Sequence, residues 1–365
     1  DHHLPGTTLP DACAIVNPNQ VGDCFLSKHL AGVGVIFYVM AALRRYLEQQ
    51  GWFKAKNIPL VNMAQYLDLV ALGTVADVVP LDQCNRILVH QGISRIRLGA
   101  ARPGIQALID ISAKTPAHIR AQDLGFSIAP RLNAAGRLDD MGIGIQCLLC
   151  ESLAEAQPLA QQLNSLNEER RLIEQEMRTQ ALHLLEKFTK KLNRVQLPAG
   201  LCLLDKSFHQ GVIGILAGRL KEQFHRPVIV FTQVNASELK ASGRSVPSLN
   251  LRDILAHINQ ENPGLMTKFG GHAMAAGITM PSQHFERFRQ HFEAAVSKQL
   301  PLDQCQGELW TDGPLSLAEF NLSTAQLLAN SGPWGQHFPE PVFEGQFHLL
   351  QQRLVGKNHL KLTLK

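Results

Sequence analysis

Four residues are candidates for a metal site, because their side chains are of types that bind divalent metals: Asp1, His2, His3 and Asp77. The chain begins with Asp1, His2 and His3, so that one carboxylate and two imidazoles lie within three residues. Such groups ligate metals, orient other ligands or contact phosphate, although a polar chain end has the same composition. Asp77 interrupts the apolar run Leu72–Leu81, where a carboxylate is costly unless it is hydrogen-bonded, paired or bound to a cation. A metal ligand and an ordinary helix cap are equally good interpretations of Asp77.

Two short segments combine arginine with small or polar residues. Arg131, Asn133 and Arg137 lie in a segment that we predict to be a loop, and guanidinium groups bind phosphate oxygens in bidentate fashion. The alternative for Arg137 is an ion pair with a neighbouring aspartate at the surface. Ser242 and Arg244 flank a glycine. At the end of a strand they would point to the same face, and the glycine would let a ligand approach the backbone.

A glycine-rich segment, residues 269–277, contains one histidine, His272. Two glycines precede this histidine and small residues follow it, a pattern that predicts a turn entering a helix. His272 would then stand beside the helix N-terminus, where anions bind. A tightly packed turn and helix would explain the glycines and alanines equally well, but not the histidine.

Composition limits the class of protein. The 365 residues are enough for two or three domains, and 45% hydrophobic with 18% charged residues is typical of a folded chain. The net charge of +4 permits a polyanionic partner without requiring one. Seven scattered cysteines favour a reducing cytoplasm. Cys147 and Cys150 are interpreted as buried thiols, because zinc would need two more ligands nearby.

The order of the predicted elements indicates an α/β protein. In residues 1–150 we expect a short strand at Ala14–Val16, a helix from about Leu30 to Gln50 and a second helix near Asn62–Val70. Helices that alternate with short strands favour a parallel sheet covered on both faces. The longest apolar run, Leu30–Leu43, is shorter than the ~20 residues that span a bilayer, so no membrane segment is expected.

The remaining residues predict a connector, a second α/β domain and a β-hairpin. Residues 151–195 have apolar side chains at three- and four-residue steps, which predicts one long amphipathic helix that holds two domains apart. Residues 196–303 show the order of a strand, a helix and a strand, with strands at Leu201–Leu204 and Val228–Phe231 and a helix from Gly211 to Phe224.

Residues 304–365 end in alternating apolar and polar residues. This pattern predicts an antiparallel hairpin with one apolar face, the beginning of a small β-barrel. The polar face carries His359, Lys361 and Lys365, which suits a track for single-stranded nucleic acid. The solvent face of a sheet is an equally good interpretation.

In this order, the motifs resemble the DHH phosphoesterase superfamily with its DHH-associated domain, and more closely the bacterial single-strand-specific exonucleases of that superfamily. The segments that carry the resemblance are DHH at Asp1, ADVVPL around Asp77, NAAGR from Asn133, SGRS from Ser242 and GGHAMAAG around His272. It covers essentially all 365 residues. It implies two α/β domains, the DHH domain and the DHH-associated domain, joined by the long helix and followed by a partial barrel of the oligonucleotide-binding (OB) type.

The resemblance also implies a reaction and a site. Two Mn²⁺ or Mg²⁺ ions would hydrolyse phosphodiester bonds of single-stranded DNA in the 5′-to-3′ direction, in DNA repair and recombination. His2 and Asp77 would be metal ligands, and Asp1 and His3 would act in catalysis. The residues that would hold the substrate and its phosphates are Arg131, Asn133, Arg137, Ser242, Arg244 and His272, with His209 and Gln210 as weaker candidates. We expect the donors of the first domain to face those of the second across one groove.

One departure from the family pattern bears on activity. The family supplies further aspartates ahead of the DHH triplet, and the sequence contains no such segment. We therefore expect the chain alone to bind metal poorly and to be nearly inactive. The alternatives are a phosphodiesterase for short oligonucleotides or cyclic dinucleotides and a non-catalytic DNA-binding scaffold. The expected partner is single-stranded DNA, with a single-strand-binding protein and a helicase as further partners in the cytoplasm.

Overall fold

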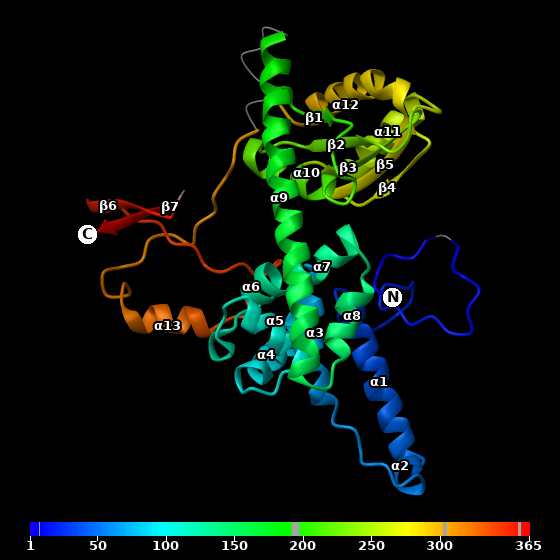
Figure 1. Ribbon diagram of the computed structural model, residues 1–365, viewed down its shortest axis with the longest axis vertical. Coiled ribbons are helices and arrows are strands. Elements are labelled where there is room, and N and C mark those ends of the chain that lie inside the picture. The colour runs from blue at the N-terminus through cyan, green and yellow to red at the C-terminus, as the bar shows by residue number, and fades with distance from the viewer. Residues whose placement is uncertain (7, 192–196, 302–304, 357–358) are drawn as a thin grey trace. The chain divides into compact units, whose positions relative to one another are not determined.

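The computed structural model describes residues 1–6, 8–191, 197–301, 305–356 and 359–365 (Figure 1). By packing, the chain divides into two compact units. The first unit contains residues 1–130, 147–160 and 309–365, and the second contains residues 131–146 and 161–308. Each unit has hydrophobic clusters of its own.

The first unit is built mainly of helices. They are α1 (Gly32–Gln49), α2 (Trp52–Ala55), α3 (Leu67–Ala76), α4 (Gln83–Arg97), α5 (Pro103–Ile111) and α6 (Ala121–Asp123), with short 3-10 helices at Met63–Tyr66 and Pro116–His118 and a π-helix at Leu124–Ile128. Helices α3 and α4 approach closely, because a Cβ atom at Gly92 would collide with the carbonyl oxygen of Leu67. Asp68 is buried in α3 and accepts a hydrogen bond from the backbone of Arg102 at 2.8 Å. These contacts fix the helix that ends at Asp77.

Helices at the two predicted positions are confirmed, but the predicted strand is wrong. Residues 14–16 form neither a helix nor a strand. The described part of residues 1–150 contains helices and loops but no strand. The carbonyl oxygen of Val16 instead accepts a hydrogen bond from the amino group of Asp1 at 2.9 Å. A strand needs a neighbouring strand, and none is formed in this part of the described chain. The parallel sheet predicted there is likewise not found among these residues.

Three helices include three of the four positions at which the two units divide in sequence. They are α7 (Ala129–Leu138), α8 (Gly142–Leu149) and α9 (Leu153–Lys191). Helix α9 confirms the long amphipathic helix over its described length, and predicted residues 192–195 lie outside the described ones. The side chains of Ala160, Leu163 and Ala181 are among those buried along it. No helix in the described ranges is long and apolar enough to cross a membrane.

The second unit contains a five-stranded sheet. Its strands are β1 (Leu201–Leu204), β2 (Val228–Gln233), β3 (Glu238–Arg244), β4 (Lys268–Gly271) and β5 (Ala275–Pro281), in the spatial order β1-β2-β3-β5-β4. The first pair is parallel and the other pairs are antiparallel. The helices of this part are α10 (Ile213–Phe224), α11 (Leu251–Glu261) and α12 (Phe285–Gln299), with a 3-10 helix at Ser282–His284. The predicted order of strand, helix and strand over β1, α10 and β2 is confirmed.

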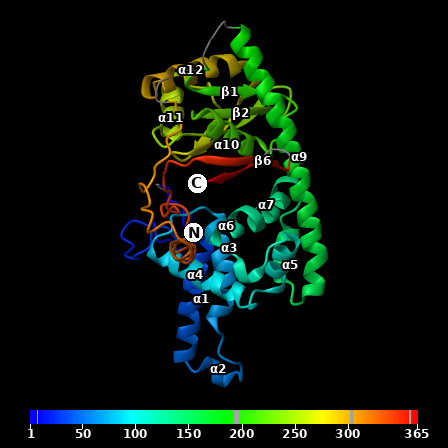
Figure 2. The same ribbon diagram turned by 90° about the vertical axis from the view of Figure 1, so that its left-hand side faces the viewer.

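The two faces of this sheet are covered differently (Figure 2). On one face, apolar residues of β2, β3 and β5 pack with α11 and α12 in a large cluster that includes Phe231, Phe288 and Phe292. On the opposite face, a second cluster contains residues of α9 and α10, but takes strand residues only from β1 and β2. The second face therefore has an apolar half and a half formed by β3, β5 and β4 that lacks this packing.

The glycine-rich segment around His272 forms a hairpin, so the helix predicted after it is wrong. Strands β4 and β5 pair, with Gly270 opposite Gly277. Side chains alternate in β5, where Ala276 and Ile278 are buried and their neighbours are not. This two-residue period is that of a strand. Gly271 has φ +144°, and a Cβ atom there would collide with backbone of the opposite strand.

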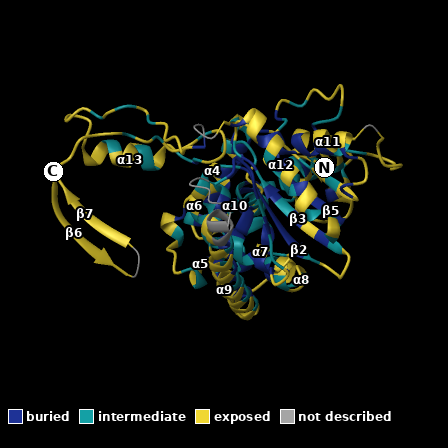
Figure 3. Ribbon diagram, turned by 90° about the horizontal axis from the view of Figure 1, so that it is seen from above, coloured by how far each residue is buried: buried dark blue, intermediate teal, exposed yellow. Residues whose placement is uncertain are grey.

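The last part of the chain contains α13 (Leu322–Asn330) and the strands β6 (Leu349–Val355) and β7 (His359–Leu364). The predicted antiparallel hairpin is confirmed, while residues 357–358 of its turn lie outside the described residues. The register pairs Leu354 with Leu360 on one face and Arg353 with Lys361 on the other. All residues of both strands are exposed (Figure 3).

Candidate functional site

The first group of candidate residues lies in the first unit. The Nε2 atom of His2 is 3.3 Å from the Oδ2 atom of Asp77, although the two residues are 75 positions apart in the sequence. The imidazole is four-fifths buried, with 20% of its side chain exposed, and the carboxylate is more open. Both predicted metal ligands are therefore brought together with their donor atoms adjacent.

Asp77 occupies an unusual place for an acidic residue. It is the C-cap residue of α3, where the helix dipole disfavours a negative charge. An acidic residue stabilises a helix at its N-terminal end. The place of Asp77 at the C-terminal end is therefore better explained by a ligand of a cation than by an ordinary helix cap. The next residue, Val78, has φ +57°, a left-handed conformation that is rare for a β-branched side chain. Backbone strain of this kind is found at functional sites.

Asp1 organises the backbone of the triplet. Its Oδ1 atom accepts hydrogen bonds from the backbone nitrogen of His2 at 2.7 Å and from that of His3 at 3.2 Å. The same oxygen is 2.7 Å from Nδ1 of His3. This contact orients the ring of His3, which lies 4.3 Å from the ring of His2 between centroids. Asp1 thus positions both histidines.

Two asparagines that were not among the predicted site residues also hold the triplet. The side-chain amide of Asn19 donates to the carbonyl oxygen of His2 at 2.7 Å, and that of Asn17 donates to the carbonyl oxygen of His3 at 2.8 Å. Asn17 is buried. The sequence Asn-Pro-Asn at residues 17–19 could have indicated a turn, but not the residues that it contacts.

Burial lowers the pKa of His2, and the nearby charge of Asp77 acts in the opposite direction. The neutral imidazole is the form that ligates metals. Imidazole and carboxylate are ligand types of divalent cations. Within the described residues, however, no group of three or more His, Cys, Asp or Glu side chains could hold a metal. His2 and Asp77 fit as two ligands of a metal site rather than as a complete set.

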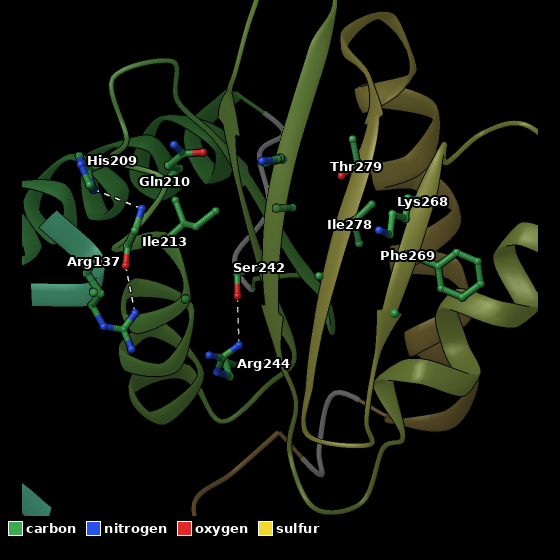
Figure 4. Close-up of a pocket in the computed structure, with 17 residues that line it drawn as sticks. Arg137, His209, Gln210, Ile213, Ser242, Arg244, Lys268, Phe269, Ile278 and Thr279 are labelled. Carbon is green, nitrogen blue, oxygen red and sulfur yellow. Dashed lines mark hydrogen bonds between the residues drawn. The ribbon is translucent and has the colours of Figure 1, made fainter. Parts of the chain in front are cut away.

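The second group of candidate residues surrounds a pocket of about 860 Å³ within the second unit (Figure 4). Of the predicted substrate-binding residues, Arg137, Ser242 and Arg244 line it, as do the weaker candidates His209 and Gln210. Ser242 and Arg244 lie on one face of β3, as predicted, and the guanidinium group donates to Oγ of Ser242 at 3.0 Å. Arg137 donates to the carbonyl oxygen of Gly211 at 3.0 Å.

Two glycines allow this arrangement, Gly211 just before α10 and Gly214 in its first turn. A Cβ atom at Gly214 would lie 3.0 Å from Oγ of Ser242 and 3.1 Å from a terminal nitrogen of Arg244. A Cβ atom at Gly211 would lie 2.6 Å from the carbonyl oxygen of Arg137. The first turn of α10 therefore lies directly against the polar side chains of β3. Its backbone N–H groups provide a partial positive charge at the pocket, which favours an anion.

The pocket has a concentrated positive charge. Burial lowers the pKa of the Arg244 guanidinium, and the proximity of Arg137 lowers it further. An arginine stays protonated despite such shifts. Two guanidinium groups that repel one another beside a helix N-terminus bind an anion favourably, since the anion offsets their repulsion.

Three predicted residues lie elsewhere. The segment with Arg131 and Asn133 belongs to helix α7 and not to a loop, because Ala134 and Ala135 pack in the interior on its buried face. The Nε atom of Arg131 donates to Asn164 of α9 at 2.9 Å, which is a contact within the unit, and Asn133 is exposed.

His272 is exposed in the loop between β4 and β5. None of Arg131, Asn133 and His272 is among the residues that line the pocket. That the donors of the two units face one another across one groove stays a prediction.

The prediction of two buried thiols in the CxxC segment is confirmed for Cys147 and wrong for Cys150, which is half-buried. Burial raises the pKa of the Cys147 thiol to about 11.

The sequence analysis missed three polar residues that line the pocket, Lys240, Lys268 and Thr279. The two-residue alternation of β3 would have indicated Lys240, which precedes Ser242 on the same face.

Two family models match this chain. A DHHA1 domain matches residues 196–298, and a RecJ OB domain matches residues 311–365. The chain is 56% identical over 366 residues to the single-stranded-DNA-specific exonuclease RecJ of Salmonella typhimurium, with 100% of the chain and 63% of the relative covered. The corresponding protein of Escherichia coli is 55% identical with the same coverage.

Solved structures of RecJ proteins also match this chain. A crystal structure of exonuclease RecJ bound to manganese matches with a TM-score of 0.62 and 31% identity, over 83% of this chain and 71% of that one. The chain belongs to the RecJ family. RecJ in complex with Mn²⁺ from Thermus thermophilus matches all of this chain with a TM-score of 0.78 and 31% identity, over 50% of that chain.

Membership of the RecJ family confirms the predicted resemblance and the α/β fold class with a DHH-associated domain and an OB region. The predicted domain borders, residues 1–150, 151–195, 196–303 and 304–365, stay predictions. The chain spans 63% of the length of its RecJ relatives from Salmonella typhimurium and Escherichia coli.

Proposed function

We propose that this chain acts in the metal-dependent hydrolysis of single-stranded DNA from a 5′ end. The observation that carries the proposal is the contact of His2 with Asp77, 3.3 Å between donor atoms at a helix C-terminus that disfavours a carboxylate. The names of the relatives, single-stranded-DNA-specific exonucleases, support the choice of substrate.

His2 and Asp77 are the residues that hold metal in this proposal, and the metals are Mn²⁺ or Mg²⁺, two ions in the working enzyme. Solved relatives contain one or the other of these metals. A pair of such ions activates water and stabilises the leaving oxygen of a phosphodiester. Asp1 keeps His2 and His3 in place through the backbone and through Nδ1 of His3. His3 then presents its other ring nitrogen to the scissile phosphate.

The pocket of the second unit holds the strand in this proposal. Ser242 and Arg244 contact the 5′-terminal phosphate, since a guanidinium and a hydroxyl on one strand face match phosphate oxygens. Arg137 supports them from α7. Arg131, Asn133 and His272 act at the edge of the substrate path. A site that grips the terminal phosphate gives the enzyme its 5′-to-3′ direction.

The hairpin β6–β7 supports a long substrate over a short one. The model of the RecJ OB domain matches this part of the chain. The register puts Arg353, Lys361 and His359 on one exposed face. Such a face suits the backbone of a single strand. Roles in repair and recombination, a location in the cytoplasm, and a single-strand-binding protein and a helicase as partners belong to the same proposal.

A chimera tests the proposal. In it, this chain replaces the residues that it matches in the Salmonella typhimurium relative. We expect Mn²⁺-dependent release of nucleotides from a 5′-phosphorylated single strand and little release from a blunt duplex. A chimera that hydrolyses a dinucleotide but not a long strand would instead identify a small-substrate phosphodiesterase. One that binds DNA without hydrolysing it, beside an active parent enzyme, would identify a scaffold.

A further inference from the structure

The uncovered half of one sheet face in the second unit is polar. The register assigns to this face every second residue of β3, β5 and β4, and places Lys240 opposite Thr279 and Thr279 opposite Lys268. These three residues form one row across three strands. The next row contains Ser242, opposite Gly277, which is in turn opposite Gly270.

The same face is apolar on the other half of the sheet. Val228 and Val230 of β2 lie in the rows of Arg244 and Ser242 and are fully buried under α10. A sheet face normally stays apolar where a helix or another layer covers it. The change from valine to arginine and from valine to serine within single rows therefore marks where packing ends and a ligand surface begins.

The two lysines are available for a ligand. Lys240 and Lys268 are exposed, line the pocket, and make no ion pair with a carboxylate in the described part of the chain. Glu238 is the acidic residue of β3 on this face, one row beyond Lys240 and opposite Pro281. The negative charge of Glu238 disfavours an anion at that end of β3. The positive region therefore extends from Arg244 to the row of the lysines.

We propose that Lys240, Thr279 and Lys268 form a second phosphate subsite, which holds an internal phosphate beyond the scissile one, in a strand whose terminal phosphate lies at Ser242 and Arg244. The inference rests on the proposed function of this pocket and extends it to a second charge. A ligand with two linked phosphates, an oligonucleotide, then binds in preference to a mononucleotide.

The spacing of the rows supports two phosphates of one strand. Residues two apart on a strand are about 7 Å apart, and neighbouring strands are about 4.8 Å apart. The Cα atoms of the two lysines are therefore about 10 Å apart, and side chains of this length converge on one anion above Thr279, whose hydroxyl donates a hydrogen bond. Figure 4 shows Thr279 and Lys268 beside one another on the neighbouring strands β5 and β4.

Glycine forms the floor beside Ser242, in the row next to the lysines. Gly277 and Gly270 occupy the row of Ser242 on β5 and β4. A Cβ atom at Gly270 would meet nothing within 4 Å. The glycine is therefore not required by packing within the chain. An open, flat floor lets sugar and base groups of the strand lie against the sheet.

The test is binding to the 365-residue chain by fluorescence anisotropy. The probes are a 5′-phosphorylated thymidine hexanucleotide and, as competitor, thymidine 5′-monophosphate. We expect the double variant Lys240→Gln/Lys268→Gln to raise the hexanucleotide Kd about tenfold, because charge-assisted contacts are lost. Its slope of log K against log salt should fall by about 0.7 for one phosphate contact. Mononucleotide affinity should not change.

Lys298→Gln is the matched control, since Lys298 is an exposed lysine on α12, the helix of the opposite sheet face. It should leave both affinities unchanged. An unchanged hexanucleotide Kd in the double variant, or equal weakening of both ligands, would overturn the second subsite. If Arg244→Ala changes neither affinity while the double variant still weakens the hexanucleotide, the terminal-phosphate assignment is wrong and the lysine subsite stands.

Discussion

The two candidate sites are held in place by different kinds of structure. His2 belongs to a segment that is neither helix nor strand, and Asp77 stands at the end of a helix. Ser242 and Arg244 are alternate residues of a strand inside a five-stranded sheet. In the first site, side chains such as Asp1 and Asn19 hold the backbone. In the second, the register of the strands sets the positions of the side chains.

This difference predicts different weaknesses. A site without a regular backbone depends on each polar contact that supports it, so loss of a hydrogen-bonding group displaces the ligands. A site on a sheet keeps its geometry when a polar group is removed, but has little room between its layers. Removal of polar groups should therefore damage the first site most, and added volume should damage the second.

The largest expected effect is that of Asp77→Ala. Loss of a metal ligand removes several kcal/mol of transition-state stabilisation, so hydrolysis by the chimera should fall about 10³-fold. Initial rates of nucleotide release at saturating Mn²⁺ measure this. Asp11→Ala removes an exposed carboxylate near the same chain end and should keep the full rate. A rate within threefold of the unsubstituted chimera would show that Asp77 binds no catalytic metal.

Arg244→Ala should have the next largest effect, on binding. Charge-assisted hydrogen bonds to a phosphate contribute about 1.5–3 kcal/mol, so the Kd for a 5′-phosphorylated strand should rise about 30-fold. A strand with a 5′-hydroxyl should lose much less, since it offers no terminal phosphate. Anisotropy titrations with the two strands compare these losses. Equal losses would contradict the assignment of Arg244 to the strand end.

Asn19→Ala tests how far the first site depends on its supports. The amide of Asn19 holds the carbonyl oxygens of His2 and Lys28. Without it, the Mn²⁺ concentration for half-maximal hydrolysis by the chimera should rise about tenfold, in the range seen for residues that orient metal ligands. Gln49→Ala, an exposed substitution on α1, is the control. An unchanged Mn²⁺ requirement would mean that the triplet keeps its position without this contact.

Gly214→Ala should have the smallest effect. It adds volume to the second site, whereas the other substitutions remove polar groups. Alanine favours the helical conformation over glycine by about 1 kcal/mol, so thermal stability should stay the same or rise. The added methyl group lies 3.0 Å from Oγ of Ser242 and 3.1 Å from Arg244, so affinity for a 5′-phosphorylated strand should fall a few-fold. Gly218→Ala, where a Cβ atom meets nothing within 4 Å, should leave affinity unchanged. Equal affinities of the two variants would contradict the close approach.

The sequence predicted regular elements well where a period was clear. The strands at Leu201 and Val228, the long helix and the final hairpin have strong two- or four-residue patterns. It failed where small residues suit both structures, as in the hairpin around His272. The loop predicted at Arg131 is a helix because Ala134 and Ala135 are buried by tertiary packing, which short-range patterns do not contain.

The candidate site was predictable in part. The pairing of His2 with Asp77 followed from the resemblance and not from spacing, since 75 positions separate them. The roles of Asn17 and Asn19 depend on contacts with residues 14 to 17 positions away. Lys268 joins the pocket through strand pairing alone. Long-range register of this kind cannot be derived from one sequence.

In this proposal, chemistry and strand binding belong to separate groups of residues. Single-turnover hydrolysis by the chimera, measured against the concentration of a 5′-phosphorylated strand, tests it most directly for Asp77→Ala and Arg244→Ala. We predict that Asp77→Ala lowers the rate at every concentration without shifting the half-saturating one, and that Arg244→Ala shifts the half-saturating concentration while the plateau rate is largely kept. A plateau rate of Arg244→Ala as low as that of Asp77→Ala would contradict the separation of chemistry from strand binding. A large shift of the half-saturating concentration in Asp77→Ala would contradict it as well.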